Sequence, residues 1–153
     1  MLTFVPVSRD EARAVRMGQV LSRPGCGATP ALRAALGADT SQEEAEYAAL
    51  SLAGVLALGV GADALRLVLA VDAEPGQIED AESELGELIL TGVPWSQVQA
   101  LFGDEPAAAP VVARARAATG GLELADALGV PEVDELGEFD LLWFAVAELD
   151  ELP

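Results

Sequence analysis

The chain has 153 residues, of which 52% are apolar, and its formal net charge is -18, from 26 acidic and eight basic residues. The apolar content excludes wholesale disorder, and the length predicts one domain over residues 1–153. Every basic residue is Arg and there is no His, which excludes Ser–His and Cys–His nucleophiles and His-containing zinc sites. The negative charge disfavours direct binding to nucleic acid.

We predict the cellular compartment from three features that the sequence lacks: a disulfide framework, a signal peptide and a membrane span. Cys26 is the only cysteine, so no intramolecular disulfide can form. The N-terminus has no basic start followed by an apolar run and a cleavage site, as a signal peptide would. The longest apolar run, Tyr47–Val60, is too short to span a membrane. We therefore expect a cytoplasmic protein with no membrane association.

The first predicted elements are a strand and a helix. Leu2–Val7 reads as a short strand, and because Pro6 cannot donate to a ladder, this is an edge strand or Pro6 marks the strand's end. Ser8 and Glu11 form a capping-box pattern that opens a helix to about Met17. One face of that helix carries three arginines, Arg9, Arg13 and Arg16.

The next segments are predicted as a loop, a short helix and a long helix. Arg23–Gly27 has the composition of a loop. Thr29 is an N-cap for a helix that ends at Leu36. Ser41 and Glu44 open the helix Ser41–Leu58, which is apolar almost all round from Tyr47 onward. Such a pattern predicts a buried central helix, with Leu52 and Leu56 in the core.

The second half alternates strands with connections. Ala64–Val71 is the strongest strand candidate, Asp72–Leu85 reads as a solvated acidic connection, and Glu87–Thr91 is a second strand. Pro106 opens an Ala-rich helix to about Ala118, and 121–128 contains one more short helical piece. Two segments fit the periods of both strand and helix, Trp95–Phe102 and Phe139–Leu149.

Five pieces of the chain occur in an order that resembles a known family. They are Phe4–Pro6, Thr29–Arg33, Glu43–Leu50, Leu67–Asp72, and Asp140–Phe144 together with Glu148 and Leu149. The chain is similar to a family of small acidic actinobacterial proteins known only as a domain of unknown function. The resemblance implies no activity, but it implies a bacterial intracellular setting, and it favours a strand in both ambiguous segments. We predict an α+β fold in which a mixed or mainly antiparallel sheet of four to five strands packs against the buried central helix and shorter helices.

Charge is distributed unevenly along the chain. Residues 1–38 carry a net charge of +3, whereas residues 39–153 carry -21. One interpretation is that the Arg-bearing start packs against the acidic remainder, and the other is a small anion-binding face on an acidic body. Two acidic clusters, 79–84 and 132–140, lack the spacing of an EF-hand and read as solvated surface, so no metal or other cofactor is predicted. Cys26, between two glycines, reads as an ordinary loop cysteine or as a thiol of lowered pKa.

Two functions from different classes remain. The first is a non-enzymatic acidic interaction or regulatory module that binds a basic protein partner, and the alternative is an enzyme that uses carboxylates and a divalent metal, in a cleft near Asp72 or Glu148. No catalytic residues are predicted. The candidate partner-binding residues are charged: Glu79, Asp80, Glu82 and Glu84 in the acidic stretch, and Arg9, Arg13 and Arg16 on the first helix.

Overall fold

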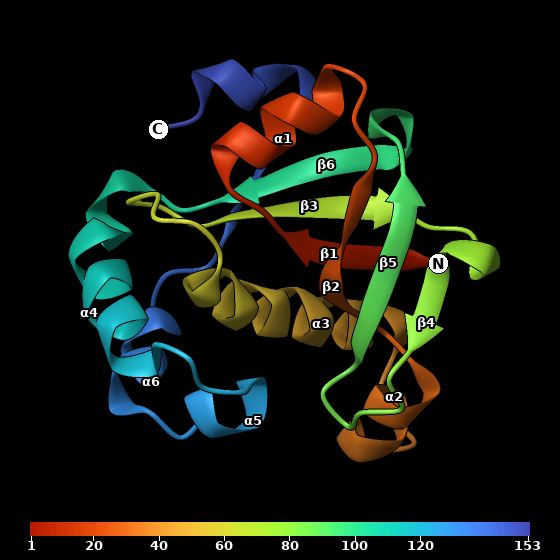
Figure 1. Ribbon diagram of the computed structural model, residues 1–153. Coiled ribbons are helices and arrows are strands. Elements are labelled where there is room, and N and C mark those ends of the chain that lie inside the picture. The colour runs from red at the N-terminus through yellow and green to blue at the C-terminus, as the bar shows by residue number, and fades with distance from the viewer.

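The computed structural model describes residues 1–153, and at its centre is an antiparallel sheet of seven strands in the order β4-β5-β2-β1-β3-β6-β7 (Figure 1). This confirms the α+β class and, of the two predicted forms of the sheet, the mainly antiparallel one, but the prediction of four to five strands was too low. The strands are β1 (Leu2–Pro6), β2 (Leu21–Gly27), β3 (Leu67–Asp72), β4 (Ile78–Asp80), β5 (Glu87–Val93), β6 (Val98–Gly103) and β7 (Leu142–Phe144).

The helices begin where the capping residues predict. Ser8, Thr29 and Ser41 each accept a hydrogen bond from the backbone three residues later, which satisfies one free N–H of the first turn. The α-helices are α1 (Arg9–Arg16), α2 (Pro30–Leu36), α3 (Gln42–Leu56), α4 (Ala109–Thr119), α5 (Leu124–Ala127) and α6 (Pro131–Leu136). Short 3-10 turns are η1 (Ala57–Gly59), η2 (Pro75–Gln77), η3 (Trp95–Gln97), η4 (Pro106–Ala108) and η5 (Val146–Glu151). None of these helices combines the length and apolar character that a membrane-spanning helix needs.

Strand β2 corrects the prediction of a loop at Arg23–Gly27. The segment pairs with β1 on one side and β5 on the other, in spite of its proline and two glycines. Close packing requires glycine at position 25, because a Cβ atom at Gly25 would lie 2.6 Å from the carbonyl oxygen of Phe4. The glycines and proline that made this segment look like a loop thus lie in a strand, where the β2 and β1 backbones approach each other closely at Gly25.

Two further strands differ from the sequence predictions. The acidic connection contains β4, which pairs with β5 at one edge of the sheet. The C-terminal segment is a strand only at Leu142–Phe144 and continues as the 3-10 turn η5. At Trp95–Phe102, the strand that the family resemblance favoured is confirmed for β6, preceded by η3.

Strand β1 lies in the middle of the sheet, so it is not an edge strand. It pairs with β3 over its whole length, from Leu2 opposite Asp72 to Pro6 opposite Val68. Pro6 is the last residue of the strand, where its missing N–H leaves the ladder intact. The second of the two interpretations of this proline is therefore confirmed.

Helix α3 crosses the sheet, but only one of its faces is buried. The buried residues are Ala45, Ala49 and Ala53, spaced by four residues, with Gly54 beside Ala53 and Ala57 one turn further on. Leu52 and Leu56 are only half-buried, and 57% of Tyr47 is exposed. The prediction that the helix is buried all round was wrong, because the small residues pack closely against the sheet and the large ones flank it.

The sheet separates two cores. On one side, β-strand leucines and valines pack against α1 and against Leu149 of η5. On the other side, α3 packs over Phe4, Cys26 and Val68. A smaller cluster holds α4 against α6, and Figure 1 shows this pair at one end of α3. The α3 side carries the candidate site.

Candidate functional site

The three arginines of α1 share one face, as predicted, and that face packs against the C-terminal turn. Arg13 lies 3.3 Å and Arg16 3.0 Å from Asp150 carboxylate oxygens. The hydrogen bond from Arg13, assisted by Arg16, lowers the pKa of Asp150. Arg9 donates to the carbonyl oxygens of Leu152 and Pro153.

The other arginines also bond within the molecule. Arg116 donates to four backbone carbonyl oxygens between Leu58 and Asp63. Three more arginines form ion pairs with carboxylates: Arg23–Glu11, Arg66–Asp104 and Arg114–Glu135. Arg33 donates hydrogen bonds to the Gln42 side chain and to the Thr40 carbonyl oxygen. Only six of the 26 carboxylates take part in ion pairs. The arginines are therefore used internally, which favours the interpretation of self-complementary packing and leaves an outward charge that is strongly negative.

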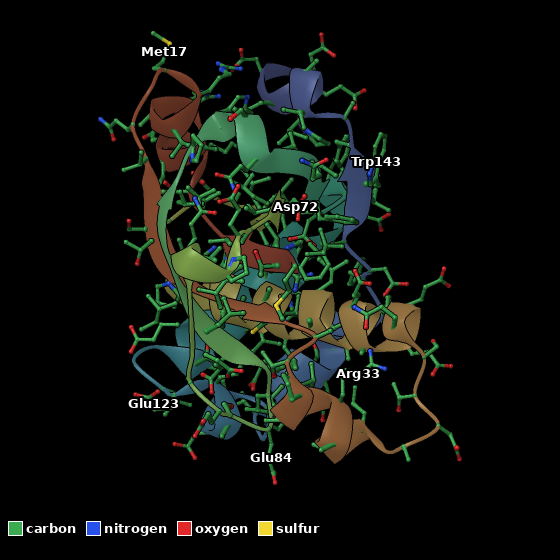
Figure 2. The ribbon with its side chains drawn as sticks, turned by 90° about the vertical axis from the view of Figure 1, so that its right-hand side faces the viewer. Met17, Arg33, Asp72, Glu84, Glu123 and Trp143 are labelled. Atoms are coloured by element: carbon green, nitrogen blue, oxygen red, sulfur yellow. The ribbon has the colours of Figure 1, made fainter.

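The predicted acidic stretch lies on β4 and the turn after it. Glu79, Asp80, Glu82 and Glu84 are all exposed. Asp80 accepts a hydrogen bond of 2.7 Å from the Glu82 backbone N–H, which supports the left-handed conformation of Glu82 at φ +55°. Figure 2 shows Glu84 and Met17, the residue after α1, at opposite ends of the molecule. The structure therefore does not bring the acidic stretch and the arginine face together.

Cys26 is a buried thiol, and the acidic side chains do not gather at a metal site. Cys26 is fully buried in β2, and burial, together with the charge of Glu87, raises its pKa to about 12. This contradicts the interpretation of an activated thiol and also that of a loop cysteine. No group of three or more Asp, Glu, Cys or His side chains is arranged to hold a metal ion.

An apolar groove lies on the α3 side of the sheet, between α3 and β7. We call it the α3–β7 groove; it has a volume of about 310 Å³. One wall is α3, with Glu46, Tyr47 and Leu50, and the opposite wall is Trp143 of β7. Trp143 is 62% exposed, and Figure 2 shows it projecting beside its strand.

The groove exists because small residues form its floor. Phe4 of β1 pairs with Ala70 of β3, which pairs with Ala100 of β6, so the three lie in one row across the sheet. The next row on β6 and β7 pairs Phe102 with Trp143. Two alanines between large aromatic residues leave a hollow that α3 does not fill.

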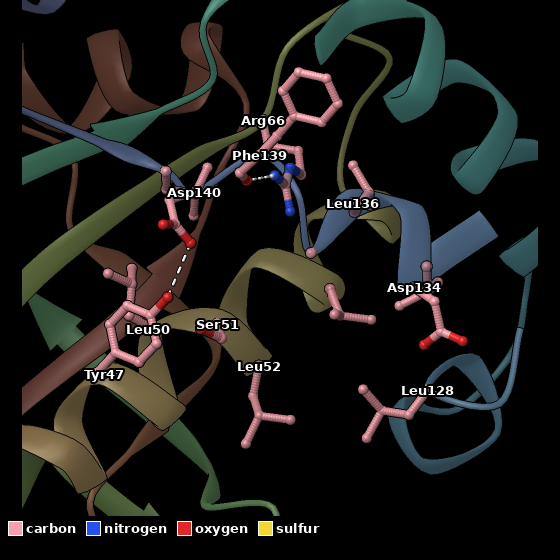
Figure 3. A pocket seen from close by; sticks show the side chains of 14 residues that line it. Tyr47, Leu50, Ser51, Leu52, Arg66, Leu128, Asp134, Leu136, Phe139 and Asp140 are labelled. Atoms are coloured by element: carbon pink, nitrogen blue, oxygen red, sulfur yellow. Dashed lines mark hydrogen bonds between the residues drawn. The ribbon is translucent and has the colours of Figure 1, made fainter. Parts of the chain in front are cut away.

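A second hollow adjoins the groove and shares Tyr47 and Leu50 with it. This α3–α6 pocket has a volume of about 340 Å³ and lies between α3, the end of α5, α6 and residues 137–141. Figure 3 shows Tyr47, Leu50 and Leu52 on the α3 side, with Leu136 and Asp134 on the α6 side. Its walls are mainly apolar, so it can accept an apolar side chain or a small apolar ligand.

A hydrogen bond joins Tyr47 to Asp140 at the boundary of the two hollows. The Tyr47 hydroxyl donates to a carboxylate oxygen of Asp140 at 2.9 Å (Figure 3). This hydrogen bond, with the negative charge of Asp140, raises the pKa of Tyr47. Asp140 and Asp134 form no ion pair, so the rim of the pocket favours a cation.

The α3–α6 pocket is also lined by Arg66, which forms a buried ion pair with Asp104. Arg66 precedes β3 and Asp104 follows β6, and the pairing of Leu67 with Gly103 brings them opposite each other. Asp104 accepts from Arg66 Nε at 2.9 Å, from Nη2 at 2.7 Å and from its backbone N–H at 2.8 Å. The guanidinium also donates to the carbonyl oxygens of Gly54 and Phe139, each at 3.3 Å. Arg66 is therefore neutralised and ties α3 and residue 139 to the sheet.

The sequence predictions missed the residues around these hollows. Arg66 could have been noticed as the one charge inside the apolar run Ala64–Val71. Trp143 lies in the run Leu141–Phe144, which predicts a strand but does not indicate which of its side chains are exposed. Tyr47 was counted as part of a buried helix. The exposure of these residues depends on where α3 and β7 lie on the sheet.

These features define a protein of the α+β class with an antiparallel sheet and an apolar surface groove between α3 and β7. The chain matches a family of unknown function, DUF6912, over residues 1–152, and it belongs to that family. No curated protein and no solved structure matches it.

Proposed function

We propose that the protein is a non-enzymatic acidic interaction or regulatory module that binds a basic protein partner. The observation that carries this proposal is the α3–β7 groove, an apolar surface with the exposed aromatic side chains of Tyr47 and Trp143. Exposed aromatic residues around a hollow are typical of binding surfaces in proteins. A bacterial, cytoplasmic setting for this function stays a prediction.

The charges around the groove support a basic partner. Glu46 lines the groove and Asp140 adjoins it, and neither is in an ion pair. Lys and Arg side chains can pair with such carboxylates and can also stack on an aromatic face. The net charge of -18 accelerates the encounter with a basic protein and makes its rate sensitive to salt.

The acidic stretch on β4 has a separate role in this proposal. Its four carboxylates are exposed and lie on β4, the edge strand opposite to β7, and in the turn after β4. We expect them to attract the partner over a distance and the groove to hold it, because exposed charges change association rates more than they change bound-state affinity. No observation favours the alternative of an enzyme that uses carboxylates and a divalent metal.

The test is affinity capture from a bacterial lysate at low and at high salt, with two variants as bait. Trp143→Ala removes the wall of the groove, and the second variant replaces Glu79, Asp80, Glu82 and Glu84 by the neutral amides. We expect the captured basic protein to be lost with Trp143→Ala. With the second variant we expect it to associate more slowly, while the melting temperature stays nearly unchanged.

Two results would contradict the proposal. One is that no basic protein is enriched at any salt concentration. The other is that both variants retain the association rate and the affinity of the parent for the captured protein. In that case the charge serves only to keep an apolar-rich chain soluble, and the quadruple variant should precipitate sooner.

A further inference from the structure

The two edges of the sheet differ in how they are protected. The β4 edge exposes the carboxylates of Glu79 and Asp80. The β7 edge exposes apolar side chains, with Leu142 at 42% and Trp143 at 62% exposure. Charged side chains on an edge strand discourage pairing with another chain, and an apolar edge without them favours it. Only the β4 edge is protected in this way.

The apolar edge is continuous with the α3–β7 groove. Trp143 belongs to β7 and is at the same time a wall of the groove. On one face of a sheet, a residue placed opposite Trp143 on an added strand would lie over the same side as the groove. Backbone pairing at β7 and side-chain binding in the groove can therefore occur together.

We infer that β7 is a docking edge, at which the basic partner adds an extended segment to the sheet as an eighth strand. The inference rests on the proposed function and specifies how the partner binds. Backbone hydrogen bonds to β7 hold the segment, and an apolar side chain enters the groove beside Trp143. Lys or Arg side chains of the segment pair with Glu46 and Asp140.

Charge complementarity selects a basic segment over a second copy of this chain. A homodimer through β7 would bring together two molecules that each carry a net charge of -18. It would also place two sets of Glu46 and Asp140 near each other, and like charges so placed repel. A basic extended segment replaces that repulsion with attraction and covers the same apolar edge.

The experiment uses a capped peptide of about eight residues in which every second residue is in turn Lys or Leu, with Thr at the positions between, so that Lys and Leu lie together on the groove face of the added strand. Binding is followed by the fluorescence of Trp143 in a Trp95→Phe background, since the chain contains only these two tryptophans. Two further peptides carry N-methyl groups on alternate backbone nitrogens, one peptide for each of the two alternating registers, so that both keep their side chains and one of them loses the N–H groups needed for pairing. A fourth peptide replaces every Lys by Glu.

We expect the basic peptide to bind, and N-methylation on the pairing side to weaken binding by a factor of about ten or more, as the loss of hydrogen bonds worth over about 1.4 kcal/mol would. The acidic peptide should bind no more tightly than the peptide that is N-methylated on the pairing side. In calorimetry, Trp143→Ala should weaken binding of the basic peptide. The matched control Val20→Ala, which removes a side chain of 61% exposure before β2, should not.

Several results would overturn the inference, and they differ from those that contradict the proposed function. N-methylated peptides of both alternating registers that bind as tightly as the parent peptide would exclude strand addition, even if a basic partner were captured from the lysate. Failure of all peptides to bind would also exclude it. A dimer in sedimentation that dissociates with Trp143→Ala would show that a second copy covers the edge. Equal binding of the basic and acidic peptides would contradict the proposed function itself.

Discussion

Arg66 and Asp104 are the two oppositely charged residues that the fold buries most completely. Side-chain exposure is 5% for Arg66 and zero for Asp104. Burial of either charge alone would be costly, and the bidentate contact with two further carbonyl acceptors offsets that cost. The pair connects β3, β6, α3 and the segment that leads to β7.

Removal of one partner of this pair should destabilise the protein strongly. Asp104→Ala leaves the Arg66 guanidinium buried without a counter-charge, so we expect a loss of about 3–5 kcal/mol in the free energy of unfolding. Urea denaturation monitored by circular dichroism measures the change. The double variant Arg66→Met, Asp104→Leu should recover much of the loss, because no uncompensated charge remains. A loss below about 1 kcal/mol for the single variant would mean that water reaches the pair.

Cys26 should make the protein less stable at alkaline pH. Its pKa in the folded protein, about 12, is above the ordinary value of 9.0, because the thiolate is disfavoured by burial and by Glu87. The stabilisation associated with the neutral thiol is therefore complete below about pH 9 and is lost as the pH rises from 9 toward 12. Between pH 8 and pH 10.5 we expect a loss of about 2 kcal/mol from this group.

Cys26→Ala provides the control for this prediction. The variant lacks the titrating thiol, so its free energy of unfolding should decline by about 2 kcal/mol less than that of the parent over the same pH range. This difference in slope does not depend on how stable the variant is at neutral pH. The native thiol should also react slowly with a thiol reagent at pH 8 and rapidly after denaturation. If the free energy of unfolding declined equally with pH in the parent and the variant, the pKa of Cys26 would be the same in the folded and the unfolded protein, and the prediction would be wrong.

At the scale of elements, α3 shows how side-chain size decides which face of a helix is buried. Its sequence has apolar residues on nearly every side, so periodicity does not select a face. The selection comes from the sheet, where a row of alanines at intervals of four residues allows the closest approach. Leu50 and Leu52 of α3 instead form sides of the groove and the pocket.

The two faces of α3 should therefore differ in how much a substitution destabilises the protein: enlarging a buried alanine should cost more than truncating a flanking leucine, the reverse of the order that hydrophobicity alone suggests. Ala53 is fully buried against the sheet, so Ala53→Leu should overpack the interface and cost about 1–3 kcal/mol or more. Leu52 is half-buried, so Leu52→Ala should cost less than the 2–5 kcal/mol typical of a core leucine. Urea denaturation of both variants measures this difference. If Leu52→Ala proved the more damaging, the assignment of the buried face would be wrong.

At the scale of the whole molecule, the charge is not balanced by the fold. The arginines bond internally, and most carboxylates have no cationic partner. Such an excess repels itself in the compact state, and salt screens the repulsion over a Debye length of about 8–10 Å. Stability should therefore depend on ionic strength.

Added salt should raise the melting temperature, and divalent ions should act only through screening. Ca²⁺ or Mg²⁺ at millimolar concentration should shift it by only a small amount, comparable to NaCl of matched ionic strength, because no carboxylate cluster is arranged to bind them. Differential scanning calorimetry with NaCl as the matched control measures this. A large shift that saturates at micromolar metal would indicate a specific site and favour the enzyme alternative.

The sequence alone determined the features that depend on neighbouring residues. Ser8, Thr29 and Ser41 marked the starts of three helices, because N-capping is a local hydrogen bond. The strong apolar run at β3 was also evident from the sequence, and Pro6 limited the first strand to two alternatives, an edge strand or a strand that ends at this residue, because proline has no N–H to donate. The α+β class followed from these elements.

Only the tertiary structure decided which residues meet. The antiparallel register placed Arg66 opposite Asp104 and put the alanines of β3 and β6 side by side to form the groove. β2 is a strand because Gly25 fits against β1, although its composition resembles a loop. Trp143 is exposed because the sheet ends at β7. Each of these depends on pairing between residues far apart in the chain, and local propensity carries no information about such pairing.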